Sequence, residues 1–385
     1  MYKIAIIQNV TPNDHRAVYI DGFVRYLNRE KFDPTVILQK TNDPLQFSDI
    51  NYNINYLDGS TYSPTGQIKF IYNSFKKLRK EDYNIIHAIN PFSSMITPFI
   101  LNKLRIKKYK IIYDIRGLWV EFGVHAGYFP AMLKYLLDWI DIYLMNRCDR
   151  IIAISNMMKK VLIEKGISKN KIDVIPSGVD LNKFESVKPI NFKDDLGFDG
   201  KIVGYVGCVS IYRGSENIIK AFRKVKNEYK EKVYLVMIGN VEQPDFFREL
   251  VHHYDLQSFV KFIGVVPHDI IPAYIKSFDI AVSYHEGDLP IYAVAVPNKI
   301  LEYMACGIPI VTTNNIAYKA ILTHGYDGYL VDQNPDSLSS GIIKVLEDEK
   351  LANTLRKNAK ETAKKYSFDE IAKKVEKVYE KVLSW

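Results

Sequence analysis

The chain has 385 residues, of which 47% are hydrophobic and 25% charged, with 20 glycines and 16 prolines. This length fits two domains of roughly 150 to 200 residues, and this composition excludes a disordered, collagenous or coiled-coil protein. The formal net charge of +8 lies wholly in residues 1–185, which hold 26 Lys and Arg against 18 Asp and Glu. This excess of positive charge could serve to bind an anionic partner, either a membrane surface or a nucleic acid. A solvated lysine-rich surface explains it equally well.

Three features bear on where the protein works. Cys148, Cys208 and Cys306 have no metal-ligand or redox spacing, which is typical of reduced thiols in the cytosol. Residues 1–10 hold one lysine and a short apolar run, the pattern of a first β-strand rather than a signal peptide. The apolar stretch Tyr135–Met145 is interrupted by two aspartates, so we expect no transmembrane helix. These features predict a cytoplasmic protein.

Short β-branched runs alternate with amphipathic helical stretches along the first half of the chain. The expected strands are Lys3–Ile7, Thr35–Leu38, Asn84–Ile89, Lys110–Tyr113, Arg150–Ile154 and Lys171–Ile175. The expected helices are Val18–Arg29, Gln67–Lys80, Ser93–Leu104 and Ala131–Asn146. Continuous apolar strands predict a parallel sheet that is buried on both faces, and the alternation with helices predicts a doubly wound sheet.

A polar stretch from Pro176 to about Gly200 has the composition of a linker, after which the alternation starts again. The expected strands are Ile202–Val206, Val233–Ile238, Val260–Ile263, Ile280–Tyr284 and Ile308–Thr312. The expected helices are Gly214–Tyr229, Pro267–Ser277, Pro297–Cys306 and Asp369–Leu383. The last of these carries one apolar stripe, made of Ile371, Val375, Val378 and Val382.

The first candidate site is a strand that leads through a glycine-bearing loop into a helix, at residues 204–214. Gly207 and Gly214 would let a ligand approach the backbone, and the N–H groups of a helix start attract anions. Arg213 can hold a diphosphate with two hydrogen bonds. The loop is neither a G-x-G-x-x-G nor a P-loop motif, which disfavours a dehydrogenase or a P-loop ATPase. The alternative is a close-packed turn with a surface arginine.

The second candidate site is the helix that begins after Pro297 and ends at Gly307. Lys299 and Glu302 are three positions apart, on one helical face near the N-terminus. A carboxylate there could accept hydrogen bonds from two hydroxyl groups, as a ribose offers them. The alternative is a surface ion pair with little effect on stability.

Several segments together resemble one family. The stretches "YVGCVSIYRGSENIIKAF", "FDIAVSYHEGDLP" and "KILEYMACGIPIV" resemble the donor-binding domain of the retaining glycosyltransferases of family four, which have the two-domain GT-B fold. "VIPSGVDLNKF" resembles the interdomain segment of that family. "YDIRGLWVEFG" resembles the Asp-x-Arg-Asp-Leu-Trp-Pro-Glu stretch of a bacterial and archaeal polysaccharide or lipid-linked glycan branch. The resemblance spans about residues 3–380.

The resemblance implies an α/β fold of two Rossmann-like, doubly wound domains that face a crevice. Residues 1–183 would bind the acceptor and residues 184–366 the nucleotide sugar. Residues 367–385 would form a C-terminal helix that packs back on the first domain.

The resemblance also implies roles for particular residues. Glu302 would bind the donor ribose and Arg213 the donor diphosphate. The other expected donor-binding residues are Gly207, Gly214, Gly239, Asn240, Val266, Glu286, Leu289 and Lys299. The candidate catalytic residues are Arg213, Arg116 and His125. The acceptor candidates are His15, Arg16, Asp114 and Glu121, although polar groups in such irregular segments are more often structural hydrogen-bonders.

Three positions depart from the family pattern. Cys208 stands where the family often has a second arginine after the first glycine of the phosphate loop. Val294 stands where a Glu-x7-Glu pattern would place its first glutamate, and Glu286 is the nearest acid upstream. Arg116 stands where many relatives have a histidine.

The expected function is the transfer of a sugar from a UDP- or GDP-sugar to a glycan or lipid-linked acceptor, with retention of anomeric configuration. We expect no cofactor and no metal ion, and the expected partners are the two substrates and an anionic membrane surface on the inner face of the cell membrane. The alternatives are a sugar-nucleotide epimerase of the same fold and a noncatalytic sugar-binding protein with two lobes. Nucleic-acid binding is suggested by charge alone, and no recognition motif supports it.

Overall fold

A computed structural model of the protein describes residues 1–14, 16–42, 50–61, 63–285 and 293–384, apart from the side chain of Lys193. The described chain divides into two compact units. The first unit holds residues 1–178, 293–296 and 368–384, and the second holds residues 179–285 and 297–367. Within the described ranges, no helix has the length and apolar character needed to cross a bilayer.

The first unit is built on a seven-stranded, all-parallel sheet with the order β3-β2-β1-β4-β5-β6-β7. Its strands are β1 (Tyr2–Gln8), β2 (Phe32–Gln39), β3 (Asn53–Leu57), β4 (Ile85–Ile89), β5 (Lys110–Ile115), β6 (Arg150–Ala153) and β7 (Ile172–Val174). Its helices are α1 (Ala17–Arg25), α2 (Pro64–Lys80), α3 (Ser93–Lys103), α4 (Trp119–His125), α5 (Lys134–Arg147), α6 (Asn156–Glu164) and α17 (Phe368–Leu383), with short 3₁₀ turns η1 (Ala131–Leu133) and η2 (Lys169–Lys171).

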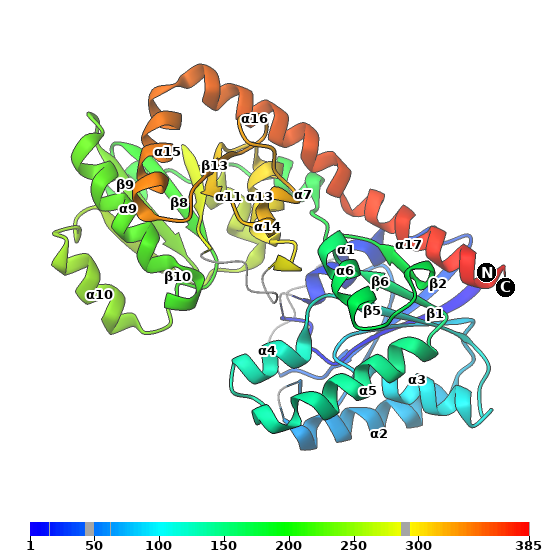
Figure 1. The fold of residues 1–385 in the computed structure, drawn as a ribbon. Coiled ribbons are helices and arrows are strands. Elements are labelled where there is room, and N and C mark those ends of the chain that lie inside the picture. Colours follow the sequence, from blue (N-terminus) through cyan, green and yellow to red (C-terminus); the bar gives the residue numbers. More distant parts are fainter. Residues whose placement is uncertain (15, 43–49, 62, 286–292, 385) are drawn as a thin grey trace. The chain divides into compact units, whose positions relative to one another are not determined.

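Helices cover both faces of this sheet (Figure 1). Helices α1 and α17 lie on one face, and α2, α3 and α5 lie on the other. The apolar stripe of α17 packs into the core that α1 and the sheet form, and its four predicted members, Ile371, Val375, Val378 and Val382, are all buried. The last helix of the chain is therefore part of the first unit's core.

The second unit is built on a six-stranded, all-parallel sheet with the order β10-β9-β8-β11-β12-β13. Its strands are β8 (Lys201–Val206), β9 (Val233–Ile238), β10 (Val260–Gly264), β11 (Ile280–Ser283), β12 (Ile310–Thr313) and β13 (Tyr329–Val331). Its helices are α7 (Leu181–Ser186), α8 (Phe192–Leu196), α9 (Ser215–Glu228), α10 (Pro244–His253), α11 (Ile271–Ile275), α13 (Asn298–Cys306), α14 (Ile316–Lys319), α15 (Pro335–Glu347) and α16 (Glu349–Ala363), with 3₁₀ turns η3 (Ile211–Arg213), η4 (His268–Ile270) and η5 (Lys364–Tyr366).

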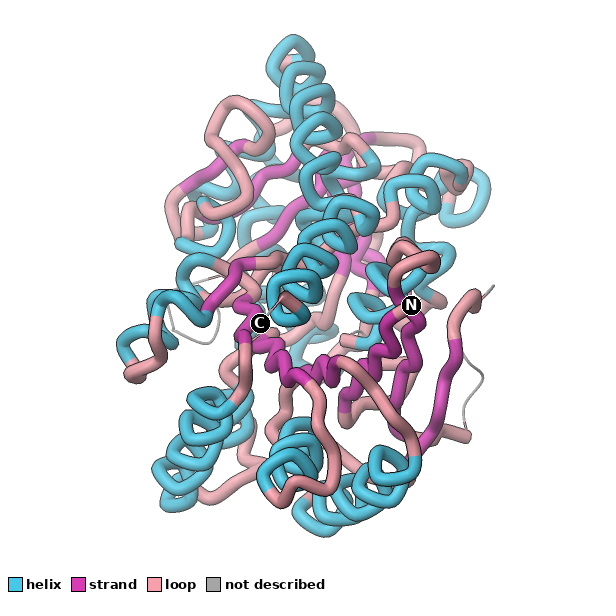
Figure 2. Tube along the Cα trace, turned by 90° about the vertical axis from the view of Figure 1, so that its right-hand side faces the viewer, coloured by secondary structure: helices cyan, strands magenta, loops and turns pink. Residues whose placement is uncertain are grey.

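Both sheets have the strand order of a doubly wound Rossmann-like fold, as the sequence predicts. Figure 2 shows each set of strands flanked by helices. In each sheet the order reverses beside the first strand, between β1 and β4 in the first unit and between β8 and β11 in the second. Ligands of open α/β sheets bind outside the carboxyl ends of the strands at this reversal. The residues that follow these four strands are therefore the first place to look for a site.

The structure corrects the sequence prediction in three places. The edge strands β3 and β13 were not predicted, and both are only partly buried. The polar stretch taken as a linker contains the short helices α7 and α8. The helix predicted over Pro267–Ser277 is divided into the turn η4 and the helix α11.

Candidate active site

Two glycine-bearing loops meet at the carboxyl end of the second sheet. Gly207 follows β8 and Gly239 follows β9, and both have φ of +134°, a region that other residues rarely adopt. A Cβ at Gly239 would lie 2.2 Å from the carbonyl oxygen of Gly207, and the Gly207 N–H donates to the Ile238 carbonyl at 2.8 Å. The two loops are therefore packed backbone against backbone. This is the kind of surface to which a phosphate can come close.

Arg213 and Gly214 lie at the start of helix α9. Gly214 has φ of +68° and precedes the first helical residue of α9, whose N–H donates to the Ser210 carbonyl at 3.2 Å. A Cβ at Gly214 would lie 2.3 Å from a ring carbon of Tyr284, which follows β11. The half-buried Arg213 guanidinium carbon lies 5.5 Å from the centroid of the Tyr212 ring. The glycine thus brings an arginine and a helix N-terminus to the strand-order reversal.

Helix α13 contributes Lys299 and Glu302 to the same end of the sheet. The helix begins after Pro297, and it ends at Gly307 with φ of +65°, as predicted. A Cβ at Gly207 would lie 2.9 Å from the amine nitrogen of Lys299, so the amine lies directly against the phosphate loop. Burial, followed by repulsion from Arg213, lowers the pKa of Lys299 to about 7.

Glu302 pairs with His268, which the resemblance places with Val265 and Val266 beside the nucleobase; the pairing itself was not predicted. The carboxylate Oε1 of Glu302 lies 3.1 Å from Nε2 of His268, in the turn η4. The Glu302 side chain is 14% exposed and that of His268 is 29% exposed, so both reach the surface. His268 belongs to the loop from Val266 to the turn η4, and Val266 itself is half-buried.

His285 is a residue that sequence reasoning missed. It follows β11 at the strand-order reversal and is 8% exposed. Burial, together with the positive charges of Lys299 and Arg213, lowers its pKa to about 3. His285 therefore stays neutral at any physiological pH. Its position as one of the first polar residues after an apolar strand was the signal that could have identified it.

The remaining donor-binding predictions have different outcomes. Asn240 is exposed directly after Gly239, at the end of β9. Glu286 and Leu289 lie outside the described residues. The other predicted donor-binding residues belong to the second unit. They lie at the carboxyl ends of its strands or at the adjoining helix starts, and they are Gly207, Gly214, Gly239, Arg213, Lys299 and Glu302. Binding roles for these residues stay predictions.

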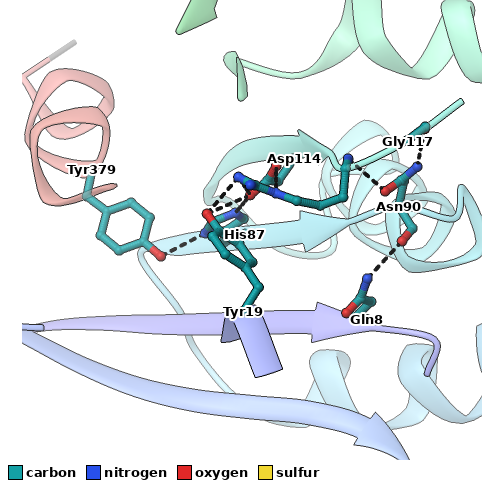
Figure 3. Close-up of polar contacts among 8 residues, drawn as sticks. Gln8, Tyr19, His87, Asn90, Asp114, Gly117 and Tyr379 are labelled. Carbon is teal, nitrogen blue, oxygen red and sulfur yellow. Dashed lines mark hydrogen bonds and ion pairs between the residues drawn. The ribbon is translucent and has the colours of Figure 1, made fainter. Parts of the chain in front are cut away.

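A second polar cluster lies in the first unit, around Asp114 at the end of β5 (Figure 3). The Asp114 carboxylate is fully buried and accepts two hydrogen bonds from Arg116, from Nε at 2.7 Å and from Nη2 at 2.8 Å. It also accepts from the hydroxyl of Tyr19 at 3.2 Å and lies 3.2 Å from Nε2 of His87. Burial alone would raise the pKa of Asp114, but the charge of Arg116 and the contact with His87 outweigh it and hold the pKa below its usual range.

This cluster fixes the direction of the Arg116 side chain. Arg116 Nη2 donates to the Tyr19 hydroxyl at 2.7 Å, and the guanidinium carbon lies 3.7 Å from the centroid of the Tyr19 ring. Its backbone N–H donates to the side chain of Asn90, which follows β4. Arg116 Nη1 is buried and has no hydrogen-bond partner in the described part of the chain. The guanidinium is thus held on one edge and has one nitrogen uncommitted.

The other first-unit predictions lie in different surroundings. Arg16 forms an ion pair with Asp14 two positions before it. Glu121 pairs with Lys165, whose amine lies 2.6 Å from it. His125 is exposed at the end of α4, and His15 lies outside the described residues. Among the first-unit candidates, the structure therefore joins Asp114 to Arg116 in one hydrogen-bonded cluster.

Within the described ranges, no group of three or more His, Cys, Asp or Glu side chains is arranged to hold a metal ion.

Comparison with known proteins places this fold and these residues in a class. The family described as "Glycosyltransferase Family 4" matches residues 17–183, and "Glycosyl transferases group 1" matches residues 188–362. A protein of Methanocaldococcus jannaschii named an uncharacterized glycosyltransferase is 30% identical over 327 residues, which are 82% of this chain and 80% of that protein. The UDP-Gal:alpha-D-GlcNAc-diphosphoundecaprenol alpha-1,3-galactosyltransferase of Escherichia coli is 24% identical over 359 residues, 87% of this chain and 85% of that enzyme.

Among solved structures, that of Anabaena Alr3699/HepE in complex with UDP matches with a TM-score of 0.74 at 19% sequence identity, over 100% of both chains. The two parallel-sheet units are those of a GT-B glycosyltransferase. The chain belongs to glycosyltransferase family 4.

Proposed function

We propose that the protein transfers a sugar from a nucleotide-diphosphate sugar to a lipid-linked glycan acceptor, with retention of anomeric configuration. The observation that carries the proposal is the convergence of Lys299, Arg213 and the α9 N-terminus on the Gly207 loop of the second unit. Two basic side chains beside a helix N-terminus form a site for a diphosphate. Membership of family 4 supports a sugar as the group that this diphosphate carries.

Each side chain of the second unit has a proposed task. Arg213 and Lys299 neutralise the charge that grows on the departing nucleotide, which is where preorganised charge lowers a barrier most. Glu302 accepts hydrogen bonds from the ribose hydroxyls. His268, at 3.1 Å from Glu302, holds that carboxylate in place.

The proposed reaction proceeds on one face of the sugar. The bond between the anomeric carbon and the diphosphate oxygen breaks, and a bond from the same carbon to the acceptor oxygen forms. The acceptor's hydroxyl proton passes to the departing diphosphate, so no protein base is needed. The protein's main contributions are orientation and charge stabilisation. Because Arg213 and Lys299 supply positive charge, we propose that transfer needs no metal ion and continues in EDTA.

The first unit is proposed to bind the acceptor. Its support is Arg116, whose guanidinium is held by Asp114 and Tyr19 and whose Nη1 remains for another oxygen. The Escherichia coli relative acts on an acceptor that carries a diphosphate and undecaprenol. We propose an acceptor of this class, a sugar on a lipid-linked diphosphate.

A lipid-linked acceptor lies at a membrane, and helix α5 has a surface suited to one. Four apolar side chains at its start are largely exposed: Met132 82%, Tyr135 81%, Trp139 63% and Leu136 54%. Cations lie beside the aromatic rings of this surface, with Lys134 over Tyr135 and Arg147 over Tyr143. Exposed aromatic side chains flanked by lysine and arginine suit the interface of an anionic bilayer. We propose that this α5 surface binds the inner face of the cell membrane.

A transfer assay tests the proposed function. The purified protein is incubated with radiolabelled UDP- and GDP-sugars and with a membrane lipid extract that contains lipid-linked glycans. We expect label to enter the organic phase with at least one donor, to do so in EDTA, and to require Arg213. Label that is released only as free sugar or as an altered nucleotide sugar, in the absence of acceptor, would instead support an epimerase.

A further inference from the structure

The amine of Lys299 has an unusual position for a lysine. It lies against the phosphate loop and 4.1 Å from the centroid of the Tyr205 ring. No hydrogen bond or ion pair joins this amine to any residue that the structure describes. Among the described residues, the charge that a protonated Lys299 would carry is therefore met by the face of the Tyr205 ring and not by a hydrogen bond or an ion pair.

The surroundings of Lys299 disfavour that charge. The residue is half-buried, Arg213 repels its charge, and it stands in the first turn of α13, where the helix dipole is positive. Glu302 and Cys208 act in the opposite direction from a distance. His285 also faces this group but is neutral. The net result is the lowered pKa of Lys299, about 7, which leaves much of the amine uncharged in mildly alkaline solution.

We propose that Lys299 takes up one proton from solution when the donor's diphosphate occupies the Gly207 loop, so that donor binding and protonation of this amine are coupled. The inference rests on the proposed function and deepens it. A diphosphate beside the loop places negative charge near the amine and offers oxygens that an ammonium group can bind. In the free protein in mildly alkaline solution most of the amine is uncharged beside Arg213, and in the complex it becomes a second cation of the site.

The residue at position 208 makes the charge of Lys299 important in this chain. Cys208 occupies the position where the resemblance to family 4 places a second arginine. A thiol supplies no positive charge to a diphosphate. Lys299 reaches the same loop from α13 and can replace that charge, but only after it has gained a proton.

Calorimetry measures the coupling directly. The donor that binds, a UDP- or GDP-sugar, is titrated at pH 8 in two buffers of low and high ionisation enthalpy, HEPES and Tris. The two phosphates of a nucleotide sugar are both esterified and do not titrate near this pH, so the buffer dependence of the heat counts protons taken up by the protein. We expect about 0.9 proton for each donor bound, because a group with a pKa near 7 is roughly one-tenth protonated at pH 8. Affinity should fall about tenfold for each pH unit above 8.

Four variants test whether the proton is taken up by Lys299. Lys299→Arg keeps a permanent charge and should bind the donor with no proton uptake, whereas Lys299→Met should bind more weakly and also without uptake. His285→Gln and the exposed control Lys350→Met should retain the uptake of the wild-type protein. Donor binding without proton uptake, or uptake that survives Lys299→Arg or disappears in His285→Gln, would overturn this inference alone. No heat with any donor would overturn the proposed function as well.

Discussion

The hydroxyl of Tyr379 lies 2.8 Å from Nδ1 of His87, although 292 positions separate the two residues. Tyr379 is on the last helix, α17, and His87 is in the middle of β4 (Figure 3). Because the Asp114 carboxylate only accepts, Nε2 of His87 carries a hydrogen, and the Tyr379 hydroxyl is the hydrogen-bond partner of the other ring nitrogen. The C-terminal helix thus completes the chain of hydrogen bonds that ends at Arg116.

Replacing this hydroxyl should weaken the first unit. Tyr379 and His87 are both fully buried, so Tyr379→Phe leaves Nδ1 of His87 without its hydrogen-bond partner. An unsatisfied buried polar atom costs about 1–3 kcal/mol. We expect urea unfolding, followed by circular dichroism, to shift to lower urea by a corresponding amount. The control Tyr326→Phe, at an exposed tyrosine, should not move the transition. An unchanged transition in Tyr379→Phe would contradict a structural role of this hydrogen bond.

Arg213→Ala should lower turnover while the fold stays intact. The guanidinium is at the surface of the site rather than in the core, and its proposed task is to stabilise charge on the leaving diphosphate. Removal of one preorganised donor of this kind costs about 10²–10³ in kcat. Initial rates of sugar transfer check this against Arg248→Ala, in which an exposed arginine is removed. Wild-type turnover in Arg213→Ala would exclude Arg213 from the diphosphate site.

The raised pKa of Asp141 predicts that the stability of the protein depends on pH. This carboxyl on α5 accepts a hydrogen bond from the buried Tyr113 hydroxyl at 2.7 Å, and burial raises its pKa to about 7. The folded protein therefore holds a proton that the unfolded chain releases near pH 4. This contribution to stability is complete below about pH 4 and is lost as the pH rises through about 7.

Asp141→Asn removes that titration. We expect the variant to unfold at higher urea than the wild-type protein at pH 8 and to show a smaller loss of stability between pH 4 and pH 8. The exposed control Asp195→Asn should follow the wild-type profile. Parallel wild-type and Asp141→Asn profiles would contradict the raised pKa.

The α5 surface predicts binding to anionic vesicles. Co-sedimentation should require anionic lipid and should fall as salt rises from about 0.15 M toward 1 M, because screening shortens the Debye length from about 8 to about 3 Å. The double variant Tyr135→Ser/Trp139→Ser should pellet less, and Tyr326→Ser, at an exposed aromatic outside α5, should pellet as the wild-type protein does. Equal pelleting with neutral and anionic vesicles, or none with either, would exclude this mode of docking.

The sequence predicts the strands of the sheet centres because these strands are continuous apolar runs. It does not predict β3, in which polar and apolar residues alternate at the start, or β13, which is three residues long. The candidate site also contains residues that the sequence predicts and contacts that it does not. Arg213, Lys299 and Glu302 lie within local motifs and were predicted.

The partners of those residues depend on long-range packing. The contact of His268 with Glu302 requires the turn η4 to meet α13, and the low pKa of Lys299 requires Arg213 and the Gly207 loop to approach it. Neither relationship has a fixed spacing along the chain. The series of hydrogen bonds from Tyr379 through His87 to Arg116 likewise joins three segments that are distant in the sequence. No local sequence pattern predicts it.

The central claim is that the second unit binds a nucleotide-diphosphate sugar through Arg213, Lys299 and Glu302. The most direct measurement is thermal unfolding with a panel of UDP- and GDP-sugars, on the wild-type protein and on Glu302→Gln. A donor present at 100 times its dissociation constant should stabilise the wild-type protein by about 2.7 kcal/mol. Loss of hydrogen bonds to a charged carboxylate, about 1.5–3 kcal/mol, should remove most of that stabilisation in Glu302→Gln, and the exposed control Glu361→Gln should keep it. No stabilisation of the wild-type protein by any donor, or an equal effect on Glu302→Gln, would contradict the account.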